Sequence, residues 1–102
     1  LLMKNLVGHQ IGRYNCLERL RTEDDYLSVY KGCNVKTSKL VLLNVYIKSN
    51  IFDILKELRD EVELFQECKS QHILSFHEKI ETKDFYIVVT DFYEKTLMDE
   101  IY

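Results

Sequence analysis

Apolar runs separated by short polar turns organise the first half of the chain. Apolar and polar residues alternate over 13–20 and 26–32, which is the pattern of half-buried β-strands that pair as a hairpin. Residues 40–46, LVLLNVY, form a nearly continuous apolar run typical of a central strand. Asn44 interrupts that run, and asparagine is depleted from strands. An amide at this position of a predicted central strand is therefore unusual.

The period of the pattern then changes. Over 49–70 apolar residues recur at spacings of three and four, which predicts an amphipathic helix. Two further strands are predicted over 73–81 and 85–93, joined by a tight turn, and a last helix begins within 95–102. Strands that flank one helix indicate an α+β domain with a mostly antiparallel sheet of five strands.

Length, composition and charge narrow the class of protein. A chain of 102 residues suffices for one small domain, and 46% hydrophobic with 30% charged residues fits a folded protein. The chain lacks a run of about 18 uncharged apolar residues, so we expect no membrane partner. A net charge of −3, with its basic residues scattered, argues against a nucleic-acid partner.

The cysteines and the first ten residues predict the compartment of the protein, and the first residue indicates whether the chain is part of a longer one. Cys16, Cys33 and Cys68 are odd in number and widely spaced, and residues 1–10 lack the pattern of a secretion signal. We therefore expect free thiols in a reducing compartment and an intracellular, cytoplasmic location. Because the chain starts with leucine rather than methionine, we also expect it to be a portion of a longer protein.

Several segments, taken in order, resemble parts of one known family. IGRYNCLERL and YLSVYKG resemble two strands around a phosphate-binding hairpin, and KLVLLNVY a third strand of the form V-A-x-K. ELRDEVELFQECKSQHIL resembles the αC helix with its following segment, and KDFYIVVTDFY a fifth strand leading into a hinge. Together they resemble the amino-terminal lobe of a eukaryotic protein kinase. The resemblance covers residues 11–102. It implies that residues 1–10 are an extension and that this chain does not include the carboxy-terminal lobe.

The resemblance implies that the phosphate-binding loop is lost. In the family, three glycines let backbone N–H groups approach the ATP phosphates. Their positions here match Thr22, Asp24 and Leu27, so none of them is glycine. Glu23 and Asp25 add carboxylates to the same turn, and carboxylates repel a triphosphate. An exposed acidic turn is the simpler interpretation of this stretch, and it is compatible with the loss.

The resemblance also accounts for Asn44. The lysine that pairs with the ATP phosphates and with a glutamate on αC falls at Asn44, while the glutamate matches Glu61. An amide carries no charge to offset phosphate. Leu42 replaces the small alanine against which adenine lies, and Val29, on the other side of the base, is kept. We therefore expect binding of ATP and magnesium to be lost or weak, with no cofactor.

Positions that build the lobe are better preserved. Phe65 and Phe76 match hydrophobic positions that stack behind the active site. Thr90 matches the gatekeeper, and Asp91 to Tyr93 match the hinge. The catalytic H-R-D and metal-binding D-F-G belong to the carboxy-terminal lobe, so this chain offers no catalytic residue and no magnesium ligand.

Simpler interpretations stand beside these. Asn44 can be a neutral polar residue at a strand bend, and Glu61 a solvated residue on the helix. Cys68, His72 and His77 have spacings seen among metal ligands, but nothing converges on them, so packing and surface positions are favoured over a metal site.

The first functional hypothesis is a pseudokinase lobe that acts as a scaffold or allosteric module. Its partner would be another protein or the missing carboxy-terminal lobe. Without that second lobe, the face around Val29, Leu42, Thr90 and Phe92 would be exposed apolar surface, which usually marks an interaction site. The helix offers a second candidate partner surface, formed by Leu55, Leu58 and Val62.

Two other hypotheses remain. The chain can be the front part of a divergent serine/threonine protein kinase that still binds ATP. Lys31, Lys39 or Lys48 would then have to supply the missing charge. Alternatively, the lobe can be a fixed structural component of a large assembly, without a regulated state.

Overall fold

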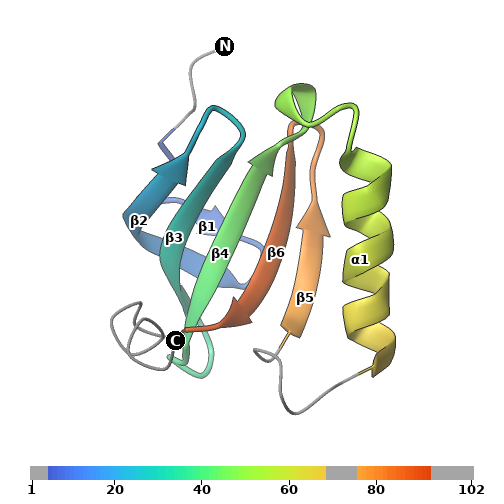
Figure 1. The fold of residues 1–102 in the computed structure, drawn as a ribbon. Helices are drawn as coiled ribbons and strands as arrows, with labels where there is room; N and C mark the ends of the chain where they lie inside the picture. Colours follow the sequence, from blue (N-terminus) through green and yellow to red (C-terminus); the bar gives the residue numbers. More distant parts are fainter. Residues whose placement is uncertain (1–4, 69–75, 93–102) are drawn as a thin grey trace, which may run out of the picture.

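Among the described residues, antiparallel pairing joins six strands into one curled sheet with one α-helix beside it (Figure 1), so the fold is α+β. The computed structural model describes residues 5–68 and 76–92. The strands are β1 (Gln10–Ile11), β2 (Tyr14–Glu23), β3 (Leu27–Asn34), β4 (Leu40–Ile47), β5 (Phe76–Glu81) and β6 (Phe85–Asp91). A short 3-10 turn, η1 (Lys48–Asn50), precedes the helix α1 (Leu55–Cys68).

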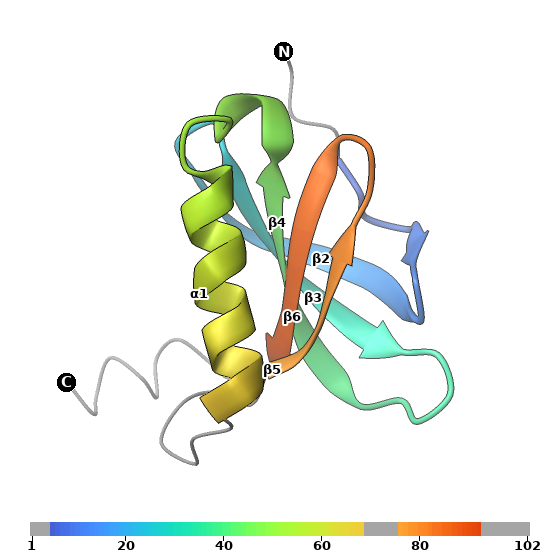
Figure 2. The ribbon, with the colours of Figure 1, turned by 90° about the vertical axis from the view of Figure 1, so that its right-hand side faces the viewer.

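The sheet order is β1-β2-β3-β4-β6-β5, so β6, the last strand in the described part of the chain, lies between β4 and β5. Helix α1 connects β4 to the edge strand β5 and lies beside it (Figures 1 and 2). Tyr14 in β2 donates a hydrogen bond from its hydroxyl to the Glu78 carboxylate in β5, at 2.7 Å. Because β2 and β5 lie far apart in the sheet order, this bond requires the sheet to curl toward closure. Burial and the Glu78 carboxylate raise the pKa of Tyr14 to about 12.

The predicted elements need three corrections. Over residues 5–68 and 76–92 the sheet has six strands rather than five, because the two-residue β1, too short to show a period, pairs with β2. The strand predicted over 13–20 continues to Glu23, so the turn after it is shorter than expected. The helix begins at Leu55 rather than at residue 49, because the η1 turn leads first to Ile51, which is buried. The helix expected within 95–102 and Tyr93 lie outside the described residues.

Both hairpin turns on β3 use a left-handed residue that is not glycine. Asp24, between β2 and β3, has a φ of 50°, and Ser38, between β3 and β4, has a φ of 63°. Asparagine helps the second turn, because the Asn34 side-chain oxygen accepts hydrogen bonds from the backbone N–H groups of Lys36 and Thr37. Aspartate tolerates the left-handed region better than most residues, which suits the tight turn at Asp24.

Strand β4 is buried on both faces, which explains its almost continuous apolar run. Leu43 and its neighbours at alternate positions face the main core, whose buried members are Leu6, Tyr14, Cys16, Tyr30, Val41, Leu43, Val45, Ile87 and Val89. The other face carries Leu27, Val29 and Leu42, with Tyr26, Tyr46 and Phe92 packed against them. We call this second side of the sheet, which also carries Asn44, the Val29 face.

Candidate functional site

The strand register brings the predicted nucleotide-site residues together on the Val29 face. Val29 in β3 pairs with Asn44 in β4, and Leu42 in β4 pairs with Thr90 in β6. Residues that pair across antiparallel strands point to the same side of a sheet. Phe76 in β5 also pairs with Thr90, so it extends the same row. Five of the predicted positions therefore lie side by side, although they come from four different strands.

Asn44 has a neutral hydrogen-bond partner in this arrangement. Its side-chain amide is half-buried and donates to the backbone carbonyl oxygen of Val88 on β6, at 3.0 Å. Burying a polar group destabilises a fold unless it is hydrogen-bonded, and this bond pairs one of the two N–H groups of the amide. The polar residue inside the apolar strand is thus explained by a contact with the neighbouring strand.

The Val29 face is covered rather than open. Val29 is 2% exposed and Leu42 is 4% exposed, while Thr90 and Phe92 are half-buried. The expectation of an exposed apolar surface around these four residues is therefore wrong for this chain. The reason is that the chain's own aromatic side chains pack against the cluster. Among them, the rings of Tyr26 and Tyr46 stack with their centroids 6.4 Å apart.

The positions matched to the three glycines have different environments. Thr22 near the end of β2 and Asp24 in the turn are exposed, whereas Leu27 begins β3 and is buried in the second cluster. The Asn50 side chain in η1 donates a hydrogen bond to the backbone carbonyl of Asp25. The turn is therefore tied to the end of β4, with its carboxylates directed to solvent.

Glu61 does not approach Asn44 through any polar contact. It is exposed on α1, and among the described residues it forms no hydrogen bond or ion pair. Glu61 contributes to the raised pKa of Tyr46, but burial is the largest cause, followed by Tyr26 and Glu23. The arrangement therefore agrees with the interpretation of Glu61 as a solvated helix residue.

Each of the three candidate lysines already has a partner. The Lys31 ammonium lies 5.2 Å from the centroid of the Phe92 ring, a cation–π contact. Lys39 is 3.5 Å from the Asp91 carboxylate, and Lys48 is 2.6 Å from that of Glu81. Of the three, only Lys31 comes from a position on the Val29 face, because it pairs across the sheet with Leu42.

Asp91, at the end of β6, also contacts His77 of β5. The His77 Nε2 atom and an Asp91 carboxylate oxygen are within hydrogen-bond distance. Burial alone would raise the pKa of Asp91, but His77 and Lys39 outweigh it and hold this pKa below its usual value. The position matched to the start of the hinge is thus fixed by contacts with β5 and with Lys39, which precedes β4.

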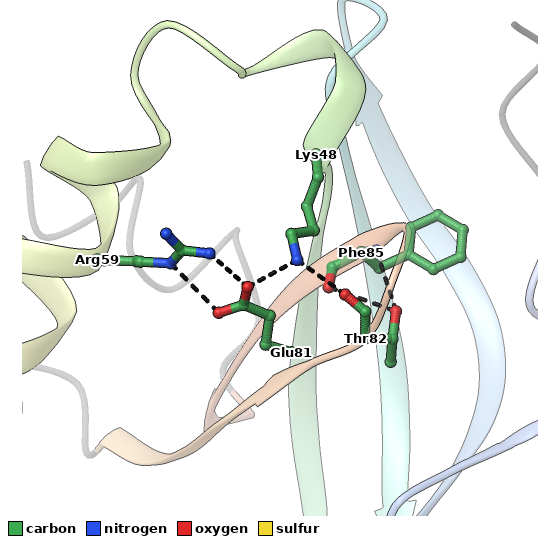
Figure 3. A network of polar contacts seen from close by, with 5 residues as sticks. All are labelled: Lys48, Arg59, Glu81, Thr82 and Phe85. Carbon is green, nitrogen blue, oxygen red and sulfur yellow. Dashed lines mark hydrogen bonds and ion pairs between the residues drawn. The ribbon is translucent and has the colours of Figure 1, made fainter.

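An ion-pair network that the sequence did not reveal joins α1 to the sheet (Figure 3). The Glu81 carboxylate at the end of β5 accepts hydrogen bonds from Lys48 in η1 and from the Arg59 guanidinium in α1. Lys48 also donates to the backbone carbonyl of Thr82, at 2.9 Å. First Arg59 and then Lys48 lower the pKa of Glu81, from an ordinary value of 4.5 to about 2. The network therefore holds the helix, η1 and the β5–β6 turn together.

Removing the shared carboxylate should weaken the fold in a pH-dependent way. Because the Glu81 side chain is 31% exposed and partly screened by water, Glu81→Gln should lower the free energy of unfolding by about 1 kcal/mol at pH 7. A carboxyl whose pKa is lowered on folding stabilises the fold above its unfolded pKa. That contribution is lost as the pH falls from about 4.5 toward 2.

Urea unfolding of both proteins between pH 7 and pH 2.5 measures this difference. The stability gap should close at the acidic end. Glu18→Gln, which changes an exposed carboxylate in β2, serves as the control and should show a much smaller gap. A gap for Glu81→Gln that stays constant down to pH 2.5 would contradict the assignment.

The predicted partner surface on α1 faces the rest of the chain. On α1, Leu55 and Leu58 are half-buried and Val62 is 2% exposed, so this side of the helix packs within the chain and leaves little surface for a partner. Phe65 lies on α1, but its side chain is outside the described part of the structure.

Cys16 and Cys33 are free thiols, and burial raises the pKa of Cys16 to about 11.

Within the described ranges, no three His, Cys, Asp or Glu side chains gather as they would around a metal ion, and His72 lies outside those ranges. No helix in the described part of the chain is long and apolar enough to cross a membrane.

No protein-family model matches the chain, and no curated protein matches it at a significant level.

Proposed function

We propose that this chain is a protein-binding module built like the amino-terminal lobe of a protein kinase, and that it does not transfer phosphate. The order of elements supports the likeness: three long strands, one helix and two further strands, with the last strand inserted beside the third. Residues 11–102 would form the lobe. Its role would be scaffolding or allosteric control of another protein or of a carboxy-terminal lobe.

One observation carries the proposal. At the position where an active kinase holds its phosphate-binding lysine, Asn44 donates its amide to the Val88 carbonyl. This side chain has no positive charge, and its amide nitrogen already donates to the neighbouring strand inside the sheet. A triphosphate brought to the Val29 face would therefore lack the cation that the family's reaction needs at this position.

Two further features point the same way. Leu42 is 4% exposed and packs with Leu27 and Val29, so apolar side chains fill the region where the base would lie. The turn at Glu23, Asp24 and Asp25 presents carboxylates, which repel phosphate unless a metal ion intervenes.

One observation favours the alternative of a divergent kinase that still binds ATP. Lys31 comes from the Val29 face and contacts an aromatic ring rather than a carboxylate, so its charge can turn toward a phosphate. Lys39 and Lys48 are held by Asp91 and Glu81 and are poorer candidates. The alternative of a fixed structural component gains no support from any contact in the described chain.

A thermal-shift titration with ATP, with and without magnesium, separates the two readings. The proposal predicts no change in Tm at millimolar ATP. A micromolar site would instead add about 4 kcal/mol at that concentration, which raises the Tm of a chain this size by more than about 10 °C. Should such a shift occur, Lys31→Met would abolish it if Lys31 supplies the charge. Lys36→Met, in the exposed β3–β4 turn, is the matched control.

A further inference from the structure

The most exposed large apolar side chains of the described residues lie in α1 and in the turn directly before it. Among the described residues, the three most exposed large apolar side chains are Phe52 at 81%, Leu64 at 58% and Ile54 at 51%. All three belong to α1 or to the turn directly before it. Single exposed apolar residues are common on protein surfaces, but three of them within thirteen consecutive residues, in α1 and the turn before it, form a candidate contact surface.

Two of these residues lie on one stripe of the helix with carboxylates between them. Ile54 directly precedes α1, and its carbonyl accepts the first helical hydrogen bond, from the backbone N–H of Leu58. Ile54, Glu57, Glu61 and Leu64 follow at spacings of three, four and three, which places them along one side of a helix. At about 1.5 Å of rise per residue, the two apolar ends of the stripe are about 15 Å apart.

The charge around this stripe is strongly negative. Between residues 52 and 64 five exposed carboxylates are present, on Asp53, Glu57, Asp60, Glu61 and Glu63. The segment has two cations, but Arg59 turns toward the sheet and binds Glu81 (Figure 3). Lys56 is therefore the single cation that the segment leaves on its outer side. An acidic surface of this kind repels nucleic acid and anionic lipid.

We propose that the outer stripe of α1 binds a basic amphipathic helix of a partner protein. Such a helix would place lysine or arginine opposite Glu57 and Glu61, and an apolar side chain against each of Ile54 and Leu64. A second copy of this chain fits poorly, because it would bring two acidic stripes together. The inference rests on the proposed function as a protein-binding module, and it names the class of partner.

Binding of a synthetic probe to the full chain tests the proposal. The probe is a labelled helical peptide of alanine, leucine and lysine in which three lysines separate two leucine pairs about 15 Å apart. Fluorescence anisotropy should show saturable binding that weakens with added salt. The same peptide with glutamate in place of lysine should not bind.

Two variants separate the apolar and the charged contributions. Ile54→Ser/Leu64→Ser and Glu57→Lys/Glu61→Lys should each weaken binding by about tenfold or more. Leu17→Ser/Leu20→Ser is the matched control, because these leucines of β2 are 45% and 43% exposed and should leave binding unchanged. An unchanged Tm in every variant shows that each one is folded.

Three outcomes of the binding experiments, and a fourth from sedimentation, would overturn the proposal. The first is no binding, and the second is an equal loss in the β2 control. The third is a loss with the charge variant alone, which would mean nonspecific attraction to an acidic surface. Sedimentation of the chain alone should show a monomer, since a dimer lost in Ile54→Ser/Leu64→Ser would assign the stripe to a second copy. A missing peptide signal leaves the ATP titration unaffected, so failures of the two proposals are distinguishable.

Discussion

Replacing Leu43 with alanine is expected to lower the free energy of unfolding by about 2–5 kcal/mol. Leu43 is fully buried in the middle of β4, where it pairs with Tyr30 on β3 and Val89 on β6. Removing its branched end loses apolar burial and leaves a cavity that the neighbouring strands cannot close without moving. Urea unfolding monitored by circular dichroism measures the change.

The control for this prediction is on the same strand. Leu40 begins β4 and is 37% exposed, so Leu40→Ala should destabilise the fold by less than about 1 kcal/mol. Similar losses for the two variants would mean that β4 is not the centre of the core. The result also tests the position of the candidate site, because Leu42 and Asn44 lie on the opposite face of the same strand.

Replacing Gly32 with alanine is expected to lower the free energy of unfolding by about 1–3 kcal/mol, by overpacking rather than by a cavity. A Cβ atom at this position in β3 would lie 2.8 Å from the Leu43 Cδ1 atom and 3.2 Å from the Val41 Cγ2 atom. Both neighbours are buried, so neither can move aside without disturbing the core. The midpoint of urea unfolding should fall with little change in slope.

A double-mutant cycle makes this second prediction sharper. In Gly32→Ala/Leu43→Ala the added methyl group enters space that the missing leucine end has vacated. The double variant should therefore be more stable than the sum of the two single losses indicates. Gly32→Ala combined with Leu40→Ala should instead be additive, since Leu40 is not among the atoms nearest the new Cβ. Additivity in both pairs would contradict the packing described for β3 and β4.

Much of the fold could be predicted from local pattern, because each strand and the helix carry their own period. The run at 40–46 indicated a central strand, and β4 is buried on both faces. The change to spacings of three and four indicated α1. Boundaries were less predictable where a tertiary contact overrides the pattern: burial of Ile51 delays the helix, and pairing with β2 creates β1.

The candidate site could be predicted in part. The resemblance named Val29, Leu42, Asn44 and Thr90 as a set, and the strand register does bring them together. The exposure of that set could not be predicted, because it depends on aromatic side chains from other segments packing over it. The ion pairs of Glu81 were also hidden, because Lys48 and Arg59 are 33 and 22 residues away and no local spacing links them.

The sequence by itself determined which segments become strands and helix, and it placed an uncharged residue at position 44, because periodicity and side-chain chemistry are local properties. Only the tertiary structure decided what Asn44 contacts, where Arg59 points and which side of α1 stays outside. Those outcomes depend on which strands become neighbours. Inserting β6 between β4 and β5 brings the Val88 carbonyl to Asn44 and the end of β5 to Arg59. The same arrangement leaves Ile54 and Leu64 exposed.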